Sequence, residues 1–151
     1  MTAETKLDIV RFSGQHRFLS NFWQVDIPHE GVIYPSVEHA YQASKSVNRI
    51  DRMRIRQAPT SGEAKWLGKQ VTLRNNWNDI KFTIMHRLVK QKFSDPGELQ
   101  DMLLATGDRK LIEGNWWGDV VWGVCKGEGE NHLGYILMGV RNELRDFLSK
   151  K

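Results

Sequence analysis

The segment YPSVEHAYQASKS, residues 34–46, gathers polar and ionisable side chains at helical spacing. In a helix, which turns by about 100° per residue, side chains at offsets of 0, 3, 4 and 7 lie within one stripe. The residues at these offsets are Glu38, Tyr41, Gln42 and Lys45. A carboxylate and an ammonium group on one stripe could act on a substrate, but charged side chains on a helix more often form a solvated face. Both interpretations stay open on this segment alone.

Tryptophans, glycines and acids crowd a second segment, EGNWWGDVVWGVCKGEGENHLG, residues 113–134. Aromatic rings beside glycines and a carboxylate suit a flat ligand, because the rings offer stacking area and the glycines let the backbone approach closely. The alternative is a hydrophobic core strand with flexible turns, since tryptophan is often simply buried. The side chains in question are Trp116, Trp117, Trp122, Glu113 and Asp119.

The only dense group of basic residues lies in NRIDRMRIRQ, residues 48–57. It consists of Arg49, Arg52, Arg54 and Arg56. Such charge runs usually form a solvated surface, although the planar guanidinium also grips phosphate oxygens. The formal net charge of +4 leans toward anionic partners. A nucleic-acid protein that uses this group is an alternative interpretation, although no helix-turn-helix, zinc-finger or RNA-recognition signature is visible.

The elements that must position these residues alternate irregularly along the chain. Short strands are expected at 7–12 and 29–36, with Pro35 suiting the first turn of the helix that follows. Further helices are expected at 60–70, where Thr60 begins a capping box, at 76–95, at 95–107 with Asp95 as its cap, and at 130–150 with Asn131 as its cap. Two more strands are expected at 110–115 and 119–125.

The order of strands, helices, strands and helix lacks regular βαβ alternation, which predicts an α+β fold. We expect a single compact domain over residues 1–151, mostly helical with a small mixed β-sheet. No linker, repeat or low-complexity tract divides the chain. His39 lies off the polar stripe and is expected to be a hydrogen-bonded structural residue rather than a base.

Composition limits the class of protein further. Hydrophobic residues make up 40% and charged residues 26%, as in globular proteins, and no apolar run approaches the length of a membrane span. The amino-terminal residues lack the pattern of a signal peptide, and the single cysteine, Cys125, cannot form an intramolecular disulfide. No Cys/His spacing suggests a metal site. We therefore expect a cytoplasmic protein with no membrane partner, no metal and no cofactor.

Five blocks of sequence, in order, resemble the NADAR family over nearly the whole chain. They are FLSNF (Phe18 to Phe22), YPSVEHAYQASK (Tyr34 to Lys45), TGDRKLIEGN (Thr106 to Asn115), GDVVWGVC (Gly118 to Cys125) and NHLGYILMGVR (Asn131 to Arg141). This resemblance implies a compact α+β fold and an N-glycosidase. Members of the family that this chain resembles cleave a ribose C1′–nitrogen bond. Some act on early intermediates of riboflavin synthesis, and others remove ADP-ribose from guanine bases of nucleic acid.

Carried onto matching positions, the resemblance implies a site drawn from the two segments above. The catalytic residues would be Glu38, Lys45, Asp119 and Trp122, and the substrate-binding residues would be Asn21, Phe22, Tyr41, Gly123, Asn131 and Gly134. At two positions this chain departs from the family: Gly139 stands where an acid is common, and Gln24 stands where proline is common. A glycine costs a helix about 1 kcal/mol relative to alanine, and we interpret Gly139 as a mark of close packing.

The implied chemistry explains these residue types. Cleavage of the C1′–nitrogen bond develops positive charge on the sugar, so one carboxylate stabilises that charge or activates water while an acid assists the leaving base. Glu38 and Asp119 would form this pair, and Trp122 would stack on the base or ribose. Lys45 would bind phosphate, tune Glu38, or attack C1′ as a Schiff-base nucleophile.

Three functions stay open. The basic balance favours an enzyme that removes ADP-ribose from guanine bases in nucleic acid, so that the partner would be an ADP-ribosylated nucleic acid or another ribosyl nucleotide. The alternatives are an N-glycosidase of riboflavin intermediates and a module that binds ADP-ribose without cleaving it. Asp119 and Trp122 lie three residues apart and would face opposite sides of a regular strand, so their joint role requires a bulge or loop between Gly118 and Gly123.

Overall fold

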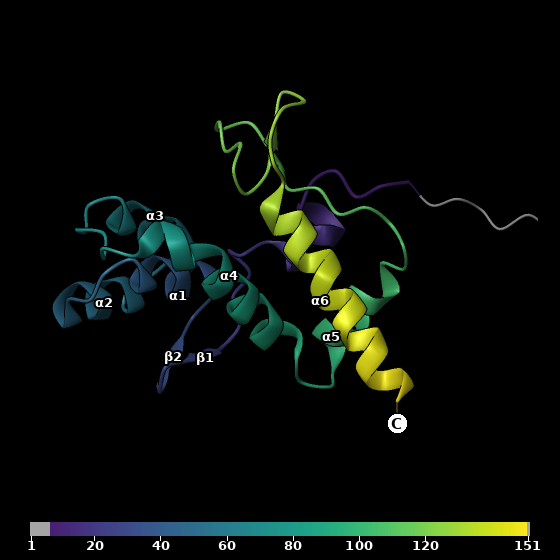
Figure 1. Cartoon of the computed structure of the whole chain (residues 1–151), viewed down its shortest axis with the longest axis horizontal. Helices are drawn as coiled ribbons and strands as arrows, with labels where there is room; N and C mark the ends of the chain where they lie inside the picture. Colours follow the sequence, from purple (N-terminus) through teal and green to yellow (C-terminus); the bar gives the residue numbers. More distant parts are fainter. Residues whose placement is uncertain (1–6, 151) are drawn as a thin grey trace, which may run out of the picture. The chain divides into compact units, whose positions relative to one another are not determined.

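The structure is a computed structural model that describes residues 7–150 (Figure 1). Its backbone contacts divide the described chain into two compact units. The central unit comprises residues 21–95, and the terminal unit comprises residues 7–20 together with 96–150. That residues 1–151 form a single domain stays a prediction. The central unit carries the polar stripe, and the terminal unit carries the tryptophan-rich segment.

A β-hairpin with a two-residue loop is the first element of the central unit. Strand β1 (Ile27–His29) pairs antiparallel with β2 (Val32–Tyr34). The connecting residues Glu30 and Gly31 have positive φ angles of 50° and 81°, as hairpins with two-residue loops require. The predicted strand at 29–36 is thus confirmed only at 32–34, and the partner strand β1 was not predicted. Pro28 inside β1 hid it, since proline normally argues against a strand.

Four helices complete the central unit. They are α1 (Val37–Ser44), α2 (Arg49–Arg56), α3 (Ser61–Gly68) and α4 (Trp77–Phe93). The Thr60 side chain accepts a hydrogen bond from the Glu63 N–H, which confirms the predicted cap of α3. Helix α1 begins after the N-cap Ser36, so Pro35 precedes the helix rather than lying in its first turn.

Helix α1 lies at the centre of this unit and contacts α2, α3, α4 and both strands. All eight of its residues are buried. The interpretation of its polar stripe as a solvated face is therefore wrong. Polar groups in such a position must find partners inside the protein, because burial without a hydrogen bond is costly.

The terminal unit begins with a 3₁₀ helix, η1, and ends with the longest helix of the structure. Its elements are η1 (Gly14–Leu19), α5 (Glu98–Ala105), β3 (Gly114–Asn115), β4 (Val124–Cys125) and α6 (His132–Ser149). The predicted helix at 95–107 starts at Glu98 with Gly97, not Asp95, as its N-cap. Helix α6 confirms the predicted carboxy-terminal helix.

The predicted strands of this unit are much shorter than expected. Residues 7–12 contribute a single parallel bridge between Ile9 and Leu111, and β3 and β4 pair in parallel over two residues each. Side chains such as Asn115 and Asp119 take up backbone hydrogen bonds in this region, which bends the chain away from regular pairing. Parallel and antiparallel pairs thus both occur, but in two separate two-stranded sheets.

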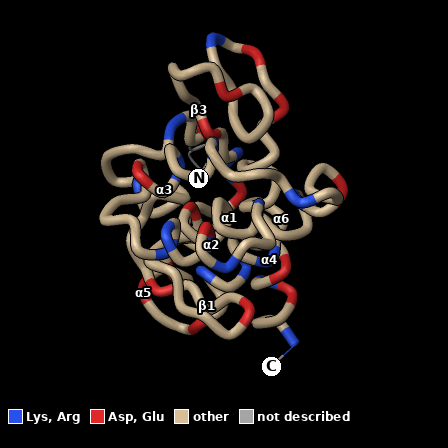
Figure 2. Tube along the Cα trace, turned by 90° about the vertical axis from the view of Figure 1, so that its left-hand side faces the viewer, with Lys and Arg blue, Asp and Glu red and all other residues tan. Residues whose placement is uncertain are grey.

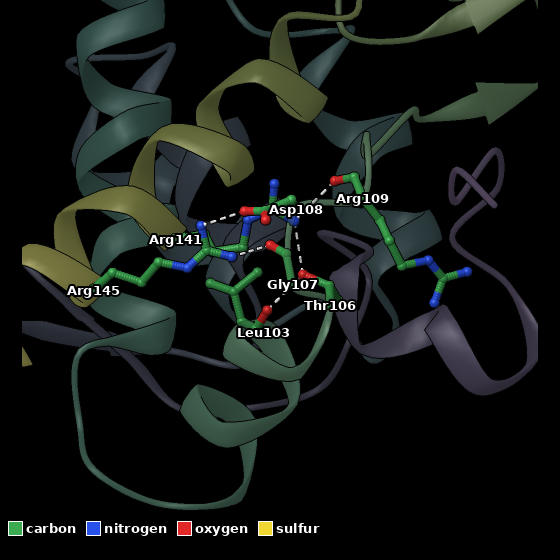
Figure 3. A network of polar contacts seen from close by, with 7 residues as sticks. All are labelled: Leu103, Thr106, Gly107, Asp108, Arg109, Arg141 and Arg145. Atoms are coloured by element: carbon green, nitrogen blue, oxygen red, sulfur yellow. Dashed lines mark hydrogen bonds and ion pairs between the residues drawn. The ribbon is translucent and has the colours of Figure 1, made fainter. Parts of the chain in front are cut away.

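A buried arginine joins α6 to the turn after α5 (Figure 3). Arg141 is only 4% exposed, and its Nη1 donates to Thr106 Oγ1 and to the Arg109 carbonyl, both at 2.9 Å. Arg145, one turn further along α6, donates to the Gly107 carbonyl and pairs with Asp108. These bonds satisfy the carbonyls of Gly107 and Arg109 in the turn that follows α5.

Helices make up about half of the described chain, and strands only a small part of it. The predicted α+β class is therefore confirmed. Gly139 does not mark close packing: a Cβ atom built there meets nothing within 4 Å, so that interpretation was wrong. None of the helices within residues 7–150 is long and apolar enough to cross a membrane.

Candidate active site

Glu38 is a buried carboxylate in the first turn of α1. Its residue is 7% exposed, its N–H donates to the Asn21 carbonyl at 3.0 Å, and its Oε1 accepts a hydrogen bond from Gln42 Nε2 at 2.8 Å. Gln42 lies one turn further along the helix, where an i, i+4 pair can meet. The hydrogen bond from the Gln42 amide fixes the orientation of the carboxylate.

Gln42 packs against Gly68 of α3, which has no side chain. A Cβ atom built on Gly68 would overlap the side-chain amide of Gln42, so only glycine allows α3 to pack this closely against α1. Gln42 is 4% exposed, and its Oε1 has no hydrogen-bond partner among the described residues. We did not predict a site role for Gln42 or Gly68. Gln42 lay on the predicted stripe, whereas no sequence signal connected Gly68 with it.

Lys45 follows α1 at its C-cap and is half-buried. Its Nζ lies 5.6 Å from the centre of the Tyr41 ring, which packs at 5.2 Å from the Trp77 ring. Burial lowers the pKa of Lys45, and the nearby Glu38 carboxylate opposes this shift. Three further ammonium groups lower the pKa as well, those of Lys65, Lys69 and Lys81. A lysine in these surroundings loses its proton more readily than one in water, and the lysine group as a whole attracts anions.

Asn21 and Phe22 lie beside the start of α1. The Asn21 side chain is buried and contacts Met85 Sδ at 3.5 Å, and the Phe22 carbonyl accepts a hydrogen bond from Ser61 Oγ at 3.1 Å. Together with the hydrogen bond from the Glu38 N–H to the Asn21 carbonyl, these contacts hold the segment against α1 and α3. The structure therefore brings five predicted site residues into one unit: Asn21, Phe22, Glu38, Tyr41 and Lys45.

His39 has the structural role that we predicted. It is 1% exposed, its Nδ1 lies 2.7 Å from Ser36 Oγ, and its Nε2 lies 2.9 Å from the Ala58 carbonyl. Burial lowers the pKa of His39, partly offset by the hydrogen bond to Ala58. A neutral imidazole bonded on both nitrogens links the start of α1 to the segment after α2, and it turns away from the polar stripe.

In the terminal unit, Asp119 shapes the tryptophan-rich segment into a loop. Its Oδ1 accepts hydrogen bonds from the N–H groups of Val121 and Trp122, at 3.1 and 2.9 Å. Its own N–H donates to Asn115 Oδ1, and its carbonyl accepts from Asn115 Nδ2. Residues 118–123 therefore form a loop and not a straight paired strand. The joint role of Asp119 and Trp122 required such a loop. The same bonds give Asp119 a structural task that the sequence did not reveal.

Three other predicted residues of this unit pack the loop onto α6. Asn131 is 4% exposed, and its side chain accepts from the Glu113 N–H and donates to the Leu111 carbonyl, both at 3.0 Å. It occupies the N-cap position of α6, but its side chain makes no capping bond. Gly123 and Gly134 lie so close to Glu113 and Leu111 that a Cβ atom on either glycine would overlap them.

Trp122 lies next to the start of α6. Its carbonyl accepts from the Leu133 N–H, and its ring lies 6.3 Å from the His132 ring at 71°. The structure thus gathers the second set of predicted site residues in the terminal unit: Asp119, Trp122, Gly123, Asn131 and Gly134. Within residues 7–150 no group of three or more His, Cys, Asp or Glu side chains is arranged to hold a metal ion.

Known proteins match this chain over most of its length. The NADAR domain family matches residues 11–145. The N-glycosidase YbiA of Shigella boydii is 33% identical over 144 residues, which cover 93% of this chain and 89% of that protein. An N-glycosidase of Nostoc punctiforme is 40% identical over 136 residues, 86% of each chain. A riboflavin biosynthesis protein of Vibrio vulnificus is 37% identical over 137 residues, 87% of this chain but 36% of that protein.

A solved structure of a protein from the same family has a similar fold. The NMR structure of YbiA from E. coli has a TM-score of 0.85 and 31% sequence identity, over 97% of this chain and 91% of that chain. The likeness confirms the α+β class. The chain belongs to the NADAR family, as the five sequence blocks predicted.

Proposed function

We propose that this protein removes ADP-ribose from modified guanine bases in nucleic acid, with Glu38 and Lys45 of α1 at the reacting bond. The coarser activity rests on the family: relatives named N-glycosidases match nearly the full chain. The protein is therefore an N-glycosidase of the NADAR family, a hydrolase of N-glycosyl bonds. The substrate and the roles of individual residues are the parts that we propose.

One observation carries the proposal: a buried carboxylate and a lysine of lowered pKa lie on the same helix among further lysines. Glu38 would stabilise the positive charge that develops at C1′ or move a proton there. The surrounding ammonium groups of Lys65, Lys69 and Lys81 favour a substrate with several negative charges. The pyrophosphate of ADP-ribose, attached to a polyanionic nucleic acid, is such a substrate.

Lys45 has two possible tasks, which differ in their chemistry. As a nucleophile, the neutral Nζ would add to C1′ after the ribose ring opens. The guanine amine would then leave with a proton, and water would hydrolyse the resulting imine to free ADP-ribose and regenerate the lysine. As a phosphate ligand, the charged ammonium would bind the pyrophosphate and take no part in bond making. The lowered pKa of Lys45 supports the first task, and the neighbouring lysines support the second.

A trapping experiment separates these tasks. If Lys45 is the nucleophile, borohydride added during turnover reduces the imine, and mass spectrometry finds ADP-ribose on the Lys45 peptide. Lys45→Arg then abolishes both adduct and turnover, because a guanidinium stays charged. If Lys45 only binds phosphate, Lys45→Arg keeps much of the turnover, no adduct forms, and the loss is mainly a raised KM. Unchanged kcat and KM in Lys45→Ala would exclude Lys45 from the site.

A second substrate class is favoured by one specific relative. The Vibrio vulnificus protein named for riboflavin biosynthesis matches 87% of this chain, and an early intermediate of that pathway offers the same C1′–nitrogen bond. Such a substrate has fewer phosphate charges for the lysine group to bind. We therefore place it second. A module that binds ADP-ribose without cleaving it would make no catalytic use of the buried Glu38 carboxylate, so we place it last.

The substrate is tested by incubating the purified protein with an oligonucleotide that carries ADP-ribosylated guanine and, separately, with the riboflavin intermediate. The products are resolved by mass spectrometry. We expect free ADP-ribose and unmodified guanine from the oligonucleotide, at a kcat/KM well above that for the intermediate. A preference for the intermediate would overturn the proposed substrate while keeping the class of reaction.

A further inference from the structure

Helix α2 and the β1–β2 hairpin enclose a groove that contains none of the active-site residues. It has a volume of about 600 Å³. Its lining includes Tyr34, Arg49, Ile50, Arg52, Met53 and Arg56, and Glu30 is its one acid. Figure 2 shows the Lys and Arg positions around α2 in blue.

The charge of the groove is positive because its acid is already paired. Glu30 Oε2 lies 2.7 Å from Arg52 Nη2, so this carboxylate is engaged with Arg52. Arg49 and Arg56 add two exposed guanidinium groups to the lining. Arg56 Nε donates to the Ile33 carbonyl at 2.8 Å, which fixes its side chain against the hairpin. A fixed guanidinium loses less conformational entropy when it binds phosphate.

Apolar side chains lie between these arginines. Ile50 is 63% exposed and Met53 is 49% exposed, although both are large hydrophobic residues. Cationic groups along a groove bind the phosphate backbone of a single strand, and the exposed aliphatic side chains between them offer apolar contact area to the base faces. A duplex hides its base faces by stacking, so the groove suits a single strand better.

The groove lies close to the proposed site within the same unit. Helices α1 and α2 pack against each other, and Arg49 comes four residues after Lys45. Four residues span at most ~14 Å even when fully extended. A strand whose modified base lies at Lys45 therefore reaches Arg49 within a few nucleotides.

We propose that this groove binds the phosphate backbone of single-stranded nucleic acid next to the ADP-ribosylated guanine. The inference rests on the proposed function, because it assigns the partner of the same site. It also gives the arginine group a task other than that of a solvated surface. The groove would supply affinity for the polymer, and α1 would supply the chemistry.

The test uses the double variant Arg49→Gln, Arg56→Gln and a charge-matched control, Arg87→Gln, Lys90→Gln, whose residues are exposed on α4. Binding of a labelled, unmodified single-stranded oligonucleotide is measured at several salt concentrations. We expect the groove variant to bind roughly tenfold more weakly or worse and to lose about 1.4 from the slope of log K against log salt, the value for two phosphate contacts. The control should keep the wild-type slope.

Kinetics supply the second measurement. The groove variant should raise KM for the ADP-ribosylated oligonucleotide, with kcat unchanged, and should hydrolyse the isolated ADP-ribosylated guanosine nucleoside at the wild-type rate. Equal behaviour of groove variant and control, in salt slope or in KM, would overturn the inference. If the wild type cleaves neither substrate, the proposed function fails, and the binding measurement still decides whether the groove holds nucleic acid.

Discussion

At the scale of single residues, the partners of Glu38 decide what its carboxylate can do. Helical spacing placed Glu38, Gln42 and Lys45 on one stripe of the sequence, and the structure keeps them there. Spacing could not tell that the stripe is buried, because burial depends on three helices that arrive from later parts of the chain. The packing of Gly68 on Gln42 is a contact of this kind.

Gly68→Ala should disturb the site without changing any polar residue. The new Cβ atom overlaps the Gln42 amide, so Gln42 must move and its hydrogen bond to Glu38 weakens. We expect kcat to fall by about tenfold or more, as small misplacements of catalytic groups often cause.

The same helix offers a control for this variant. A Cβ atom on Gly62 would meet only Thr60 Oγ1, at an ordinary distance of 3.8 Å. Gly62→Ala should therefore keep the wild-type kcat. If Gly68→Ala kept a kcat equal to that of Gly62→Ala, the positioning of Glu38 by Gln42 would have to be abandoned.

At the scale of elements, the tryptophan-rich loop shows where sequence patterns mislead. Residues 119–125 have the β-branched and aromatic composition of a strand, yet only Val124 and Cys125 pair as one. Asp119 and Asn115 compete for the backbone N–H and carbonyl groups that a strand would use. The hairpin was missed for the opposite reason, since a proline within β1 concealed a real strand.

Asp119→Asn separates the catalytic role of this residue from its role in the loop. The amide oxygen of asparagine can still accept the N–H groups of Val121 and Trp122, so the loop and the thermal midpoint should be kept. Only the charge is lost. If Asp119 is the second carboxylate of the reaction, turnover should fall about a hundredfold or more. Wild-type turnover in Asp119→Asn would make Asp119 a loop-forming residue alone.

At the scale of the whole molecule, stability should depend on one buried lysine. Lys92 of α4 is 6% exposed, and burial lowers its pKa to about 7. In the unfolded chain its pKa returns to about 10.4. Between these values the unfolded chain binds more protons than the folded protein, so the Lys92 contribution makes the free energy of unfolding rise with pH from about 7 to about 10.

Lys92→Met keeps the length of the side chain and removes the charge. Below pH 7 the variant should be more stable than the wild type by a few kcal/mol, because the folded wild type then carries a buried ammonium group. The difference should shrink steadily as pH rises toward 10. Denaturant unfolding of both proteins across this range measures it. A difference that does not change with pH would show that Lys92 keeps an ordinary pKa.

Family, fold class and the longer helices could be predicted from this sequence because they depend on local patterns: the capping pair Thr60 and Glu63, the periodic apolar residues of α6, and the matched blocks. What could not be predicted depends on distant partners. Asn131 is an example, since its side chain bonds to Leu111 and Glu113 instead of capping α6.

The most direct test of the account is the turnover of Glu38→Gln on ADP-ribosylated guanine, compared with Glu63→Gln. Glu63 is exposed on α3, so its variant controls for the loss of a carboxylate in the same unit. We predict that Glu38→Gln folds with a thermal midpoint near that of the wild type and loses turnover by about a hundredfold or more, while Glu63→Gln stays fully active. A folded Glu38→Gln protein with wild-type turnover would contradict the central claim that the buried stripe of α1 performs the reaction.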